Sequence, residues 1–188
     1  MYYHTLNFTV NSFLKIFFKT KVNGVENIPK GGGFVLCANH MSNYDPLILR
    51  LIIPRQINFM AKKELFSNKL FSYTLKKFGV FPVDRSKNDL DAYREAIKIL
   101  KNGKVLGIFI QGTRAQNVDA AKNGAAMFAI KAGVSVIPVG INASYKFFSE
   151  VKINIGQPIS FQKPSKINQE TLEPITTKIL CAIKNLIE

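Results

Sequence analysis

His40 and Asp45 are the two residues whose types and spacing best suit catalysis, and they lie together in residues 39–46. Five positions apart, they would occupy different faces of one continuous helix, because only residues three or four apart stack on a helix. The turn-forming pair Ser42-Asn43 lets the chain fold back so that the carboxylate reaches the imidazole. The carboxylate would then fix the imidazole tautomer and stabilise the imidazolium, leaving the other ring nitrogen for a substrate proton.

The elements on either side of this pair place it at the edge of a sheet. Residues 34–38 form an apolar run of the length of a buried strand and give way at once to polar residues. In open α/β sheets, ligands bind at the carboxyl ends of the strands. Asp45-Pro46 predicts a helix start, with Asp45 at the N-cap and Pro46 at the first helical position. Capping alone is the simpler role for Asp45, and the two roles are compatible because a carboxylate has two oxygens.

Strand and helix patterns alternate along the rest of the chain. Apolar runs predict strands at 21–26, 57–61, 79–85, 105–110, 135–139 and 151–155. Helical periodicity and end signals predict helices at 46–53, 89–101, 124–132 and 168–187. This alternation predicts one α/β domain with a mostly parallel sheet flanked by helices.

Two stretches have the amphipathic pattern of helices that lie on a lipid surface. In residues 5–19, apolar side chains recur at helical spacing with Asn and Lys between them. In residues 62–78, Leu and Phe side chains share a face against five lysines, which suits a lipid surface or an acyl-chain pocket. Each has a simpler alternative: the first helix packs on its own domain, and the second presents a solvated basic face over an ordinary core.

Length and charge limit the classes of function. At 188 residues the chain is long enough for one domain with a real core. The net charge of +14 indicates an anionic partner, namely lipid headgroups, nucleic acid or phosphorylated metabolites. The sequence has no recognisable nucleic-acid motif and no aromatic–basic signature of the common RNA folds. We find no signal-peptide pattern and no run near the ~18 apolar residues that spanning a membrane requires.

The two cysteines, Cys37 and Cys181, have neither metal-ligand spacing nor a disulfide framework, which favours a reduced compartment and predicts no metal site. Cys37 lies three residues before His40, so a Cys–His nucleophile has to be considered. A buried structural cysteine is the favoured interpretation, because the neighbours of Cys37 are apolar.

Three motifs stand in order along the chain, and a fourth apolar stretch with a proline follows them. They are Asn-His-Met-Ser-Asn-Tyr-Asp at 39–45, Gly-Val-Phe-Pro-Val-Asp-Arg at 79–85, Phe-Ile-Gln-Gly-Thr-Arg at 109–114, and Val-Ile-Pro-Val at 136–139. Together they resemble the glycerophospholipid acyltransferase family, and within it the bacterial 1-acylglycerol-3-phosphate acyltransferases, over about residues 22–158. The resemblance implies the glycerol-phosphate acyltransferase-like α/β fold. It also implies transfer of an acyl group from a thioester, on acyl-carrier protein or coenzyme A, to the free hydroxyl of 1-acylglycerol-3-phosphate, which gives phosphatidic acid in phospholipid biosynthesis.

The resemblance also implies roles for single residues. His40 matches the general base and Asp45 the carboxylate that orients it. A general base typically raises the reaction rate by ~10²–10⁴-fold. The residues that match the family's substrate-binding motifs are Arg85, Gln111, Gly112, Thr113 and Arg114. Arginine forks suit a phosphate group. The simpler alternatives are a surface ion pair of Arg85 with Asp84 and a solvated loop at Arg114.

One residue departs from the family pattern. Ile110-Gln111 stands where the family usually has Pro-Glu, and an amide carries no charge, so the identity of the acceptor is open. No cofactor is implied beyond the acyl donor.

These observations predict an N-terminal amphipathic membrane-associating helix in residues 1–20 and an acyltransferase domain in residues 21–188. They predict a peripheral or monotopic enzyme at the cytoplasmic face of the cell membrane. Its expected partners are a lysophospholipid acceptor, an acyl thioester donor and an anionic membrane surface, and nucleic acid is not expected. The alternatives are an acyltransferase for another lysophospholipid and a non-catalytic basic membrane-binding module.

Overall fold

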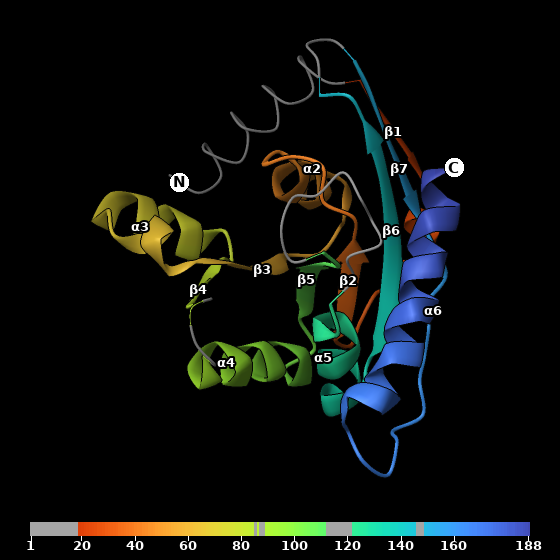
Figure 1. The fold of residues 1–188 in the computed structure, drawn as a ribbon. Helices are drawn as coiled ribbons and strands as arrows, with labels where there is room; N and C mark the ends of the chain where they lie inside the picture. Colours follow the sequence, from red (N-terminus) through yellow and green to blue (C-terminus); the bar gives the residue numbers. More distant parts are fainter. Residues whose placement is uncertain (1–18, 85, 87–88, 112–121, 146–148) are drawn as a thin grey trace.

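The computed structural model describes residues 19–84, 86, 89–111, 122–145 and 149–188 (Figure 1). These residues form a seven-stranded sheet in the order β1-β7-β6-β2-β5-β3-β4. The strands are β1 (Lys19–Asn23), β2 (Phe34–Ala38), β3 (Ile57–Lys62), β4 (Phe81–Val83), β5 (Val105–Phe109), β6 (Ser135–Ala143) and β7 (Glu150–Ile155). Neighbours from β6 to β4 are all parallel, whereas β7 runs antiparallel to β6 and parallel to β1. The predicted class, a mostly parallel sheet flanked by helices, is confirmed.

Helices cover both faces of the sheet and create two apolar layers (Figure 1). The helices are α2 (Asp45–Ile52), α3 (Lys69–Lys77), α4 (Leu90–Lys101), α5 (Gly124–Ala132) and α6 (Gln169–Ile187), with short 3₁₀ turns η1 (Val25–Asn27) and η2 (Lys63–Phe66). One layer lies beneath α2, and the other lies beneath α4, α5 and α6. All five residues of β2 are buried, because this central strand is covered on both faces.

Strand β2 lies between β5 and β6, and its carboxyl end is fixed by both neighbours. Ala38 is in register with Phe109 of β5 and with Val139 of β6. The buried side chain of Asn39 then continues the pairing: its Nδ2 donates to the carbonyl of Ile141 at 2.8 Å, and its Oδ1 accepts from the amide of Ile141 at 2.7 Å. The chain therefore leaves the sheet toward His40 from a fixed point.

The stretch at 62–78 differs from the single amphipathic segment that its pattern predicted. It is divided into η2 and α3, because the side chain of Asn68 accepts from the amides of Leu70 and Phe71 and so starts a new helix. No residue of α3 is fully buried, and its side chains Leu70, Phe71 and Tyr73 are exposed.

Several other boundaries differ from the sequence-based expectation, and the strand expected within 79–85 is limited to Phe81–Val83. The first strand covers Lys19–Asn23 rather than 21–26, because Gly24 turns the chain with φ 81° into η1. Helix α4 starts one residue late: the side chain of Asp89 caps it by accepting from the amide of Ala92 at 3.0 Å. Strand β6 continues beyond residue 139 to Ala143, since its last residues pair with β7. The predicted N-terminal helix lies almost wholly in residues 1–18, outside the described residues, and remains a prediction.

In the described part of the chain, no helix combines the length and apolar character needed to cross a membrane.

Packing between β5 and β3 gives a test of the core. A Cβ added at Gly107 would overlap the ring of Phe59 and lie 2.7 Å from Cγ2 of Ile57. We expect Gly107→Ala to lower the free energy of unfolding by about 1–3 kcal/mol, as overpacking of a core does. Gly31→Ala is the matched control, because a Cβ there meets nothing within 4 Å among the described residues. Urea unfolding of both variants measures the difference, and equal midpoints would contradict this account of the β5–β3 contact.

Candidate active site

The structure brings His40 and Asp45 into direct contact, as their spacing predicted. Nδ1 of His40 lies 2.7 Å from Oδ2 of Asp45. The Asp45 side chain is fully buried, whereas 15% of the His40 side chain is exposed. Because the carboxylate accepts from Nδ1, Nε2 is the ring nitrogen left to act on a substrate proton.

Asp45 does not cap the following helix in the way that the sequence suggested. Tyr44 occupies the N-cap position, and Asp45 is the first residue of α2. Oδ2 of Asp45 instead accepts from the backbone amides of Met41 at 2.7 Å and Ser42 at 2.8 Å, in addition to His40. The carboxylate therefore closes the turn that precedes the helix, and this turn is what carries the imidazole back onto it.

A stack of aromatic rings from two other strands holds the imidazole. The ring of Phe109 lies parallel to the ring of His40, with centroids 3.9 Å apart and an interplanar angle of 14°. Phe59 stacks in turn on Phe109 at 5.7 Å. These contacts fix the plane of the imidazole from the side of β5 and leave it little freedom to rotate away from Asp45.

Gln111 meets His40 through its side chain. Oε1 of Gln111 accepts from the backbone amide of His40 at 3.1 Å. The residue is 2% exposed, and its Nε2 has no hydrogen-bond partner among the described residues. A buried donor without a partner is costly, so this amide is a candidate to receive an acceptor atom from a bound substrate.

The other four predicted binding residues lie outside the described residues: Arg85, Gly112, Thr113 and Arg114. Only the strands before them are placed. Strand β5 is adjacent to β2, whereas β4 lies three strands away, roughly 14 Å at ordinary strand spacing. The approach of the two guanidinium groups to His40 therefore remains a prediction.

Cys37 is the buried structural cysteine that its neighbours indicated. It packs into the layer beneath α4, α5 and α6. Burial raises the pKa of the Cys37 thiol far above its ordinary value, which disfavours the thiolate that a nucleophile needs. The Cys–His alternative therefore has no support. Among the described residues, no group of three or more His, Cys, Asp or Glu side chains could hold a metal ion.

Tyr145 is a site residue that the sequence interpretation missed. Its hydroxyl donates to Oδ1 of Asp45, the carboxylate oxygen that His40 does not use. Tyr145 adopts a left-handed backbone conformation with φ 54°, which is unusual for an aromatic residue and marks a constrained position. It follows the end of β6 by two residues. The sequence predicted that this strand ends at residue 139, six residues before Tyr145, so Tyr145 was not expected at the edge of the sheet.

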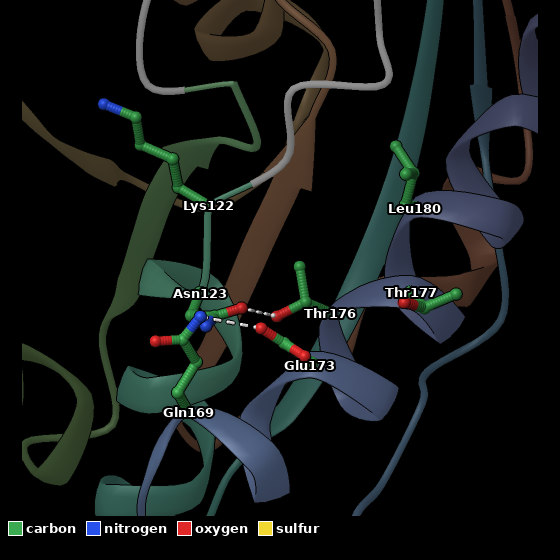
Figure 2. A pocket seen from close by; sticks show the side chains of 7 residues that line it. All are labelled: Lys122, Asn123, Gln169, Glu173, Thr176, Thr177 and Leu180. Carbon is green, nitrogen blue, oxygen red and sulfur yellow. Dashed lines mark hydrogen bonds between the residues drawn. The ribbon is translucent and has the colours of Figure 1, made fainter.

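A polar depression between α5 and α6 is a separate feature. Figure 2 shows its lining, where Thr176 donates to Asn123 at 2.7 Å and Gln169 donates to Glu173 at 2.8 Å. These residues satisfy one another, and none of the site residues around His40 belongs to the lining. The depression therefore does not contribute to the chemistry of His40.

A histidine at the carboxyl end of a central parallel strand, paired through Nδ1 with a buried carboxylate, is the arrangement that an α/β enzyme with a general base would use. The Acyltransferase family model matches residues 19–142. The chain belongs to this family, as the sequence motifs predicted.

Similar proteins agree with this assignment. The chain is 37% identical to the 1-acyl-sn-glycerol-3-phosphate acyltransferase of Bacillus subtilis, over 74% of this chain and 73% of that protein. It is 32% identical to the protein of the same name from Streptococcus pneumoniae, over 82% of this chain and 61% of that one. The crystal structure of the 1-acyl-sn-glycerophosphate (LPA) acyltransferase PlsC from Thermotoga maritima has a TM-score of 0.69 and 27% identity, and the match covers 97% of this chain and 81% of that chain.

Tyr145 offers a test that depends on pH. Tyr145→Phe removes a donor to a buried carboxylate, so we expect the free energy of unfolding to fall by about 1.5–3 kcal/mol. Burial, and then the hydrogen bond to Asp45 and its negative charge, raise the pKa of Tyr145. The pKa of Tyr145 is therefore higher in the folded protein than in the unfolded chain. Its hydroxyl contributes its full stabilisation below about pH 10, and this stabilisation is lost progressively at higher pH, where the tyrosine of the unfolded chain ionises first.

Urea unfolding at about pH 8 and about pH 11 measures this effect. The difference between the parent protein and Tyr145→Phe should be larger at the lower pH. An equal difference at both values would show that the hydroxyl bond to Asp45 does not carry the effect.

Proposed function

We propose that this protein transfers a fatty acyl group from a thioester to the free hydroxyl of 1-acylglycerol-3-phosphate, giving phosphatidic acid. The observation that carries the proposal is the His40–Asp45 pair, with its 2.7 Å contact at Nδ1 and a partly exposed imidazole. The names of the similar proteins from Bacillus subtilis and Streptococcus pneumoniae support the same acceptor. A non-catalytic basic module has no use for a buried carboxylate aimed at a histidine.

The reaction follows from the positions of the two groups. An alcohol is a poor nucleophile at neutral pH, so Nε2 of His40 takes the hydroxyl proton as the acceptor oxygen attacks the thioester carbon. The tetrahedral intermediate then collapses, the carbon–sulfur bond breaks, and the imidazolium returns the proton to the departing thiolate. The products are the new ester and a free thiol. Acyl-carrier protein and coenzyme A both supply such a thioester, and the same residues serve either donor.

Asp45 contributes by holding one tautomer and by stabilising the imidazolium that forms when the proton moves. A flexible carboxylate would perform this poorly. Here the backbone amides of Met41 and Ser42 and the hydroxyl of Tyr145 fix both oxygens before a substrate arrives. The imidazole therefore needs no reorganisation during proton transfer, which is the condition under which a general base works best.

We assign recognition of the glycerol-phosphate end to Arg85, Gln111, Gly112, Thr113 and Arg114. Arginine forks match phosphate oxygens geometrically. Gln111 is the member of this set with a described position, and its contact with the His40 amide supports a proposed acceptor site beside the base.

The net charge of +14 supports an anionic membrane surface as the place of reaction, at the cytoplasmic face of the cell membrane. Residues 1–20 serve in this proposal as the membrane-associating segment, because their pattern is amphipathic and basic. A peripheral position of this kind gives the enzyme access to a lipid acceptor and a water-soluble donor together.

The base is tested by substitution. His40→Ala should reduce phosphatidic acid formation from lysophosphatidic acid and an acyl thioester by about 10²–10⁴-fold, because the acceptor hydroxyl loses its base. Cys37→Ala is the matched control, since the thiol is buried in the opposite layer and should not be needed. Mass spectrometry of the lipid product measures the rate, and circular dichroism checks folding. A folded His40→Ala protein with near-parent activity would remove the mechanism.

A second candidate function is acyl transfer to another lysophospholipid, and the buried amide of Gln111 favours it. Nε2 of Gln111 donates where the family's usual carboxylate accepts, so the two side chains select different acceptor groups.

A panel of lysophospholipids with one thioester donor tests this. If Gln111 selects the acceptor, Gln111→Glu should change relative rates in the panel by roughly tenfold or more, because the side chain loses its hydrogen-bond donor. The variant keeps an oxygen to accept from the His40 amide, so the position of the base is controlled. An unchanged ranking would restrict Gln111 to positioning His40, and a low rank for lysophosphatidic acid would replace the named acceptor.

A further inference from the structure

The short helix α3 carries large apolar side chains on its outside. Leu70 is 72% exposed, Tyr73 is 53% exposed and Phe71 is 49% exposed, and Leu65 in the preceding η2 is 48% exposed. Half of the exposed large hydrophobic side chains in the described residues therefore lie in this one stretch of nine positions. Single exposed apolar residues are ordinary, whereas a cluster of this kind marks a surface that binds something.

Helix α3 has no fully buried residue, and contacts at both of its ends hold it in place. Asn68 caps its start. At its other end, Nη1 of Arg50 donates to the carbonyl of Phe78 at 2.9 Å, and the guanidinium lies 4.3 Å from the centroid of the Phe78 ring. The outer apolar side chains are thus presented by a helix that is fixed in position, so their exposure is a stable property of the fold.

The cluster lies at the same edge of the sheet as the proposed base. Strand β3 ends at Lys62 and η2 begins at Lys63, so this segment starts from the carboxyl ends of the parallel strands, as His40 does. Figure 1 shows α3 beyond β3 and β4, at the end of the sheet opposite to β1 and α6. Met41 and Tyr44, on either side of Ser42 and Asn43 in the site loop, are also exposed, at 42% and 44%.

The charges around the cluster identify its partner. The segment from Lys62 to Lys77 contains five lysines and one acidic residue, Glu64. All five lysines are exposed. Lysines that flank exposed Leu, Phe and Tyr side chains are the composition of a helix lying in the interface of an anionic bilayer. An acidic protein surface would form ion pairs with the lysines but would leave much of the apolar surface exposed to water.

We propose that η2 and α3 dock on an anionic lipid bilayer, with Leu65, Leu70, Phe71 and Tyr73 entering the headgroup region and the lysines meeting lipid phosphates. This inference rests on the proposed function, because it explains how a site at this edge reaches a lipid acceptor. It assigns membrane contact to a segment of the folded domain, separately from residues 1–20.

Vesicle co-sedimentation of the full chain tests the surface, with phosphatidylcholine vesicles compared with vesicles that also contain phosphatidylglycerol. The parent protein should bind the anionic vesicles and bind the neutral ones far more weakly. The double variant Leu70→Asp/Phe71→Asp should lower the partition coefficient by about tenfold or more. The triple variant Lys69→Gln/Lys76→Gln/Lys77→Gln should lower it by roughly fivefold per lysine and reduce its dependence on salt.

Leu90→Asp is the matched control: Leu90 is 61% exposed but lies in α4, on another element. Its binding should equal that of the parent protein. Equal vesicle binding by parent and both α3 variants would overturn the proposal. It would also be overturned if the α3 substitutions changed only the oligomeric state, or only the binding of acyl-carrier protein. Acyl transfer by the parent protein to a dispersed short-chain acceptor reports separately on the proposed function.

Discussion

The buried carboxylate of Asp45 is the constraint around which the candidate site is built. A carboxylate removed from water costs several kcal/mol unless hydrogen bonds replace its hydration. In the described residues its two oxygens receive four donors: Nδ1 of His40, the amides of Met41 and Ser42, and the hydroxyl of Tyr145. These hydrogen bonds fix the conformation of the loop after β2. In this conformation the imidazole of His40 is partly exposed to solvent.

The sheet makes this arrangement possible by bringing three strand ends together. His40 follows β2, Gln111 follows β5 and Tyr145 follows β6, and β2 lies between the other two strands. The segments after both neighbours contribute polar contacts to the loop, through Gln111 to the His40 amide and through Tyr145 to Asp45. A parallel arrangement is what allows it, because all three strands end at the same edge. The apolar layers beneath α2 and beneath α4, α5 and α6 hold the strands in register.

The opposite tendencies of burial and exposure at this edge suit a lipid substrate. The carboxylate of Asp45 is buried and fully hydrogen-bonded, whereas the large apolar side chains of η2 and α3 stay exposed. In a protein that acts only in water, such side chains would be expected to pack inward. A surface that binds a lipid bilayer accounts for this exposure, because burial in the bilayer interface removes the apolar side chains from water.

The sequence by itself determined the alternation of strands and helices, the position of His40 past a buried strand, and its pairing with Asp45, because these follow from short-range periodicity and turn chemistry. It also identified the family, through motifs that are local in the chain. Tertiary structure alone decided which oxygen of Asp45 accepts from which donor and that β7 runs antiparallel to β6. It also decided that Tyr145, which lies 100 positions from Asp45 in the sequence, contacts Asp45. Such contacts join distant segments whose register no local pattern encodes. For the same reason the sequence did not show that α3 is exposed: its apolar spacing resembles that of a packed helix, and only the fold of the described residues shows that Leu70, Phe71 and Tyr73 stay on the surface.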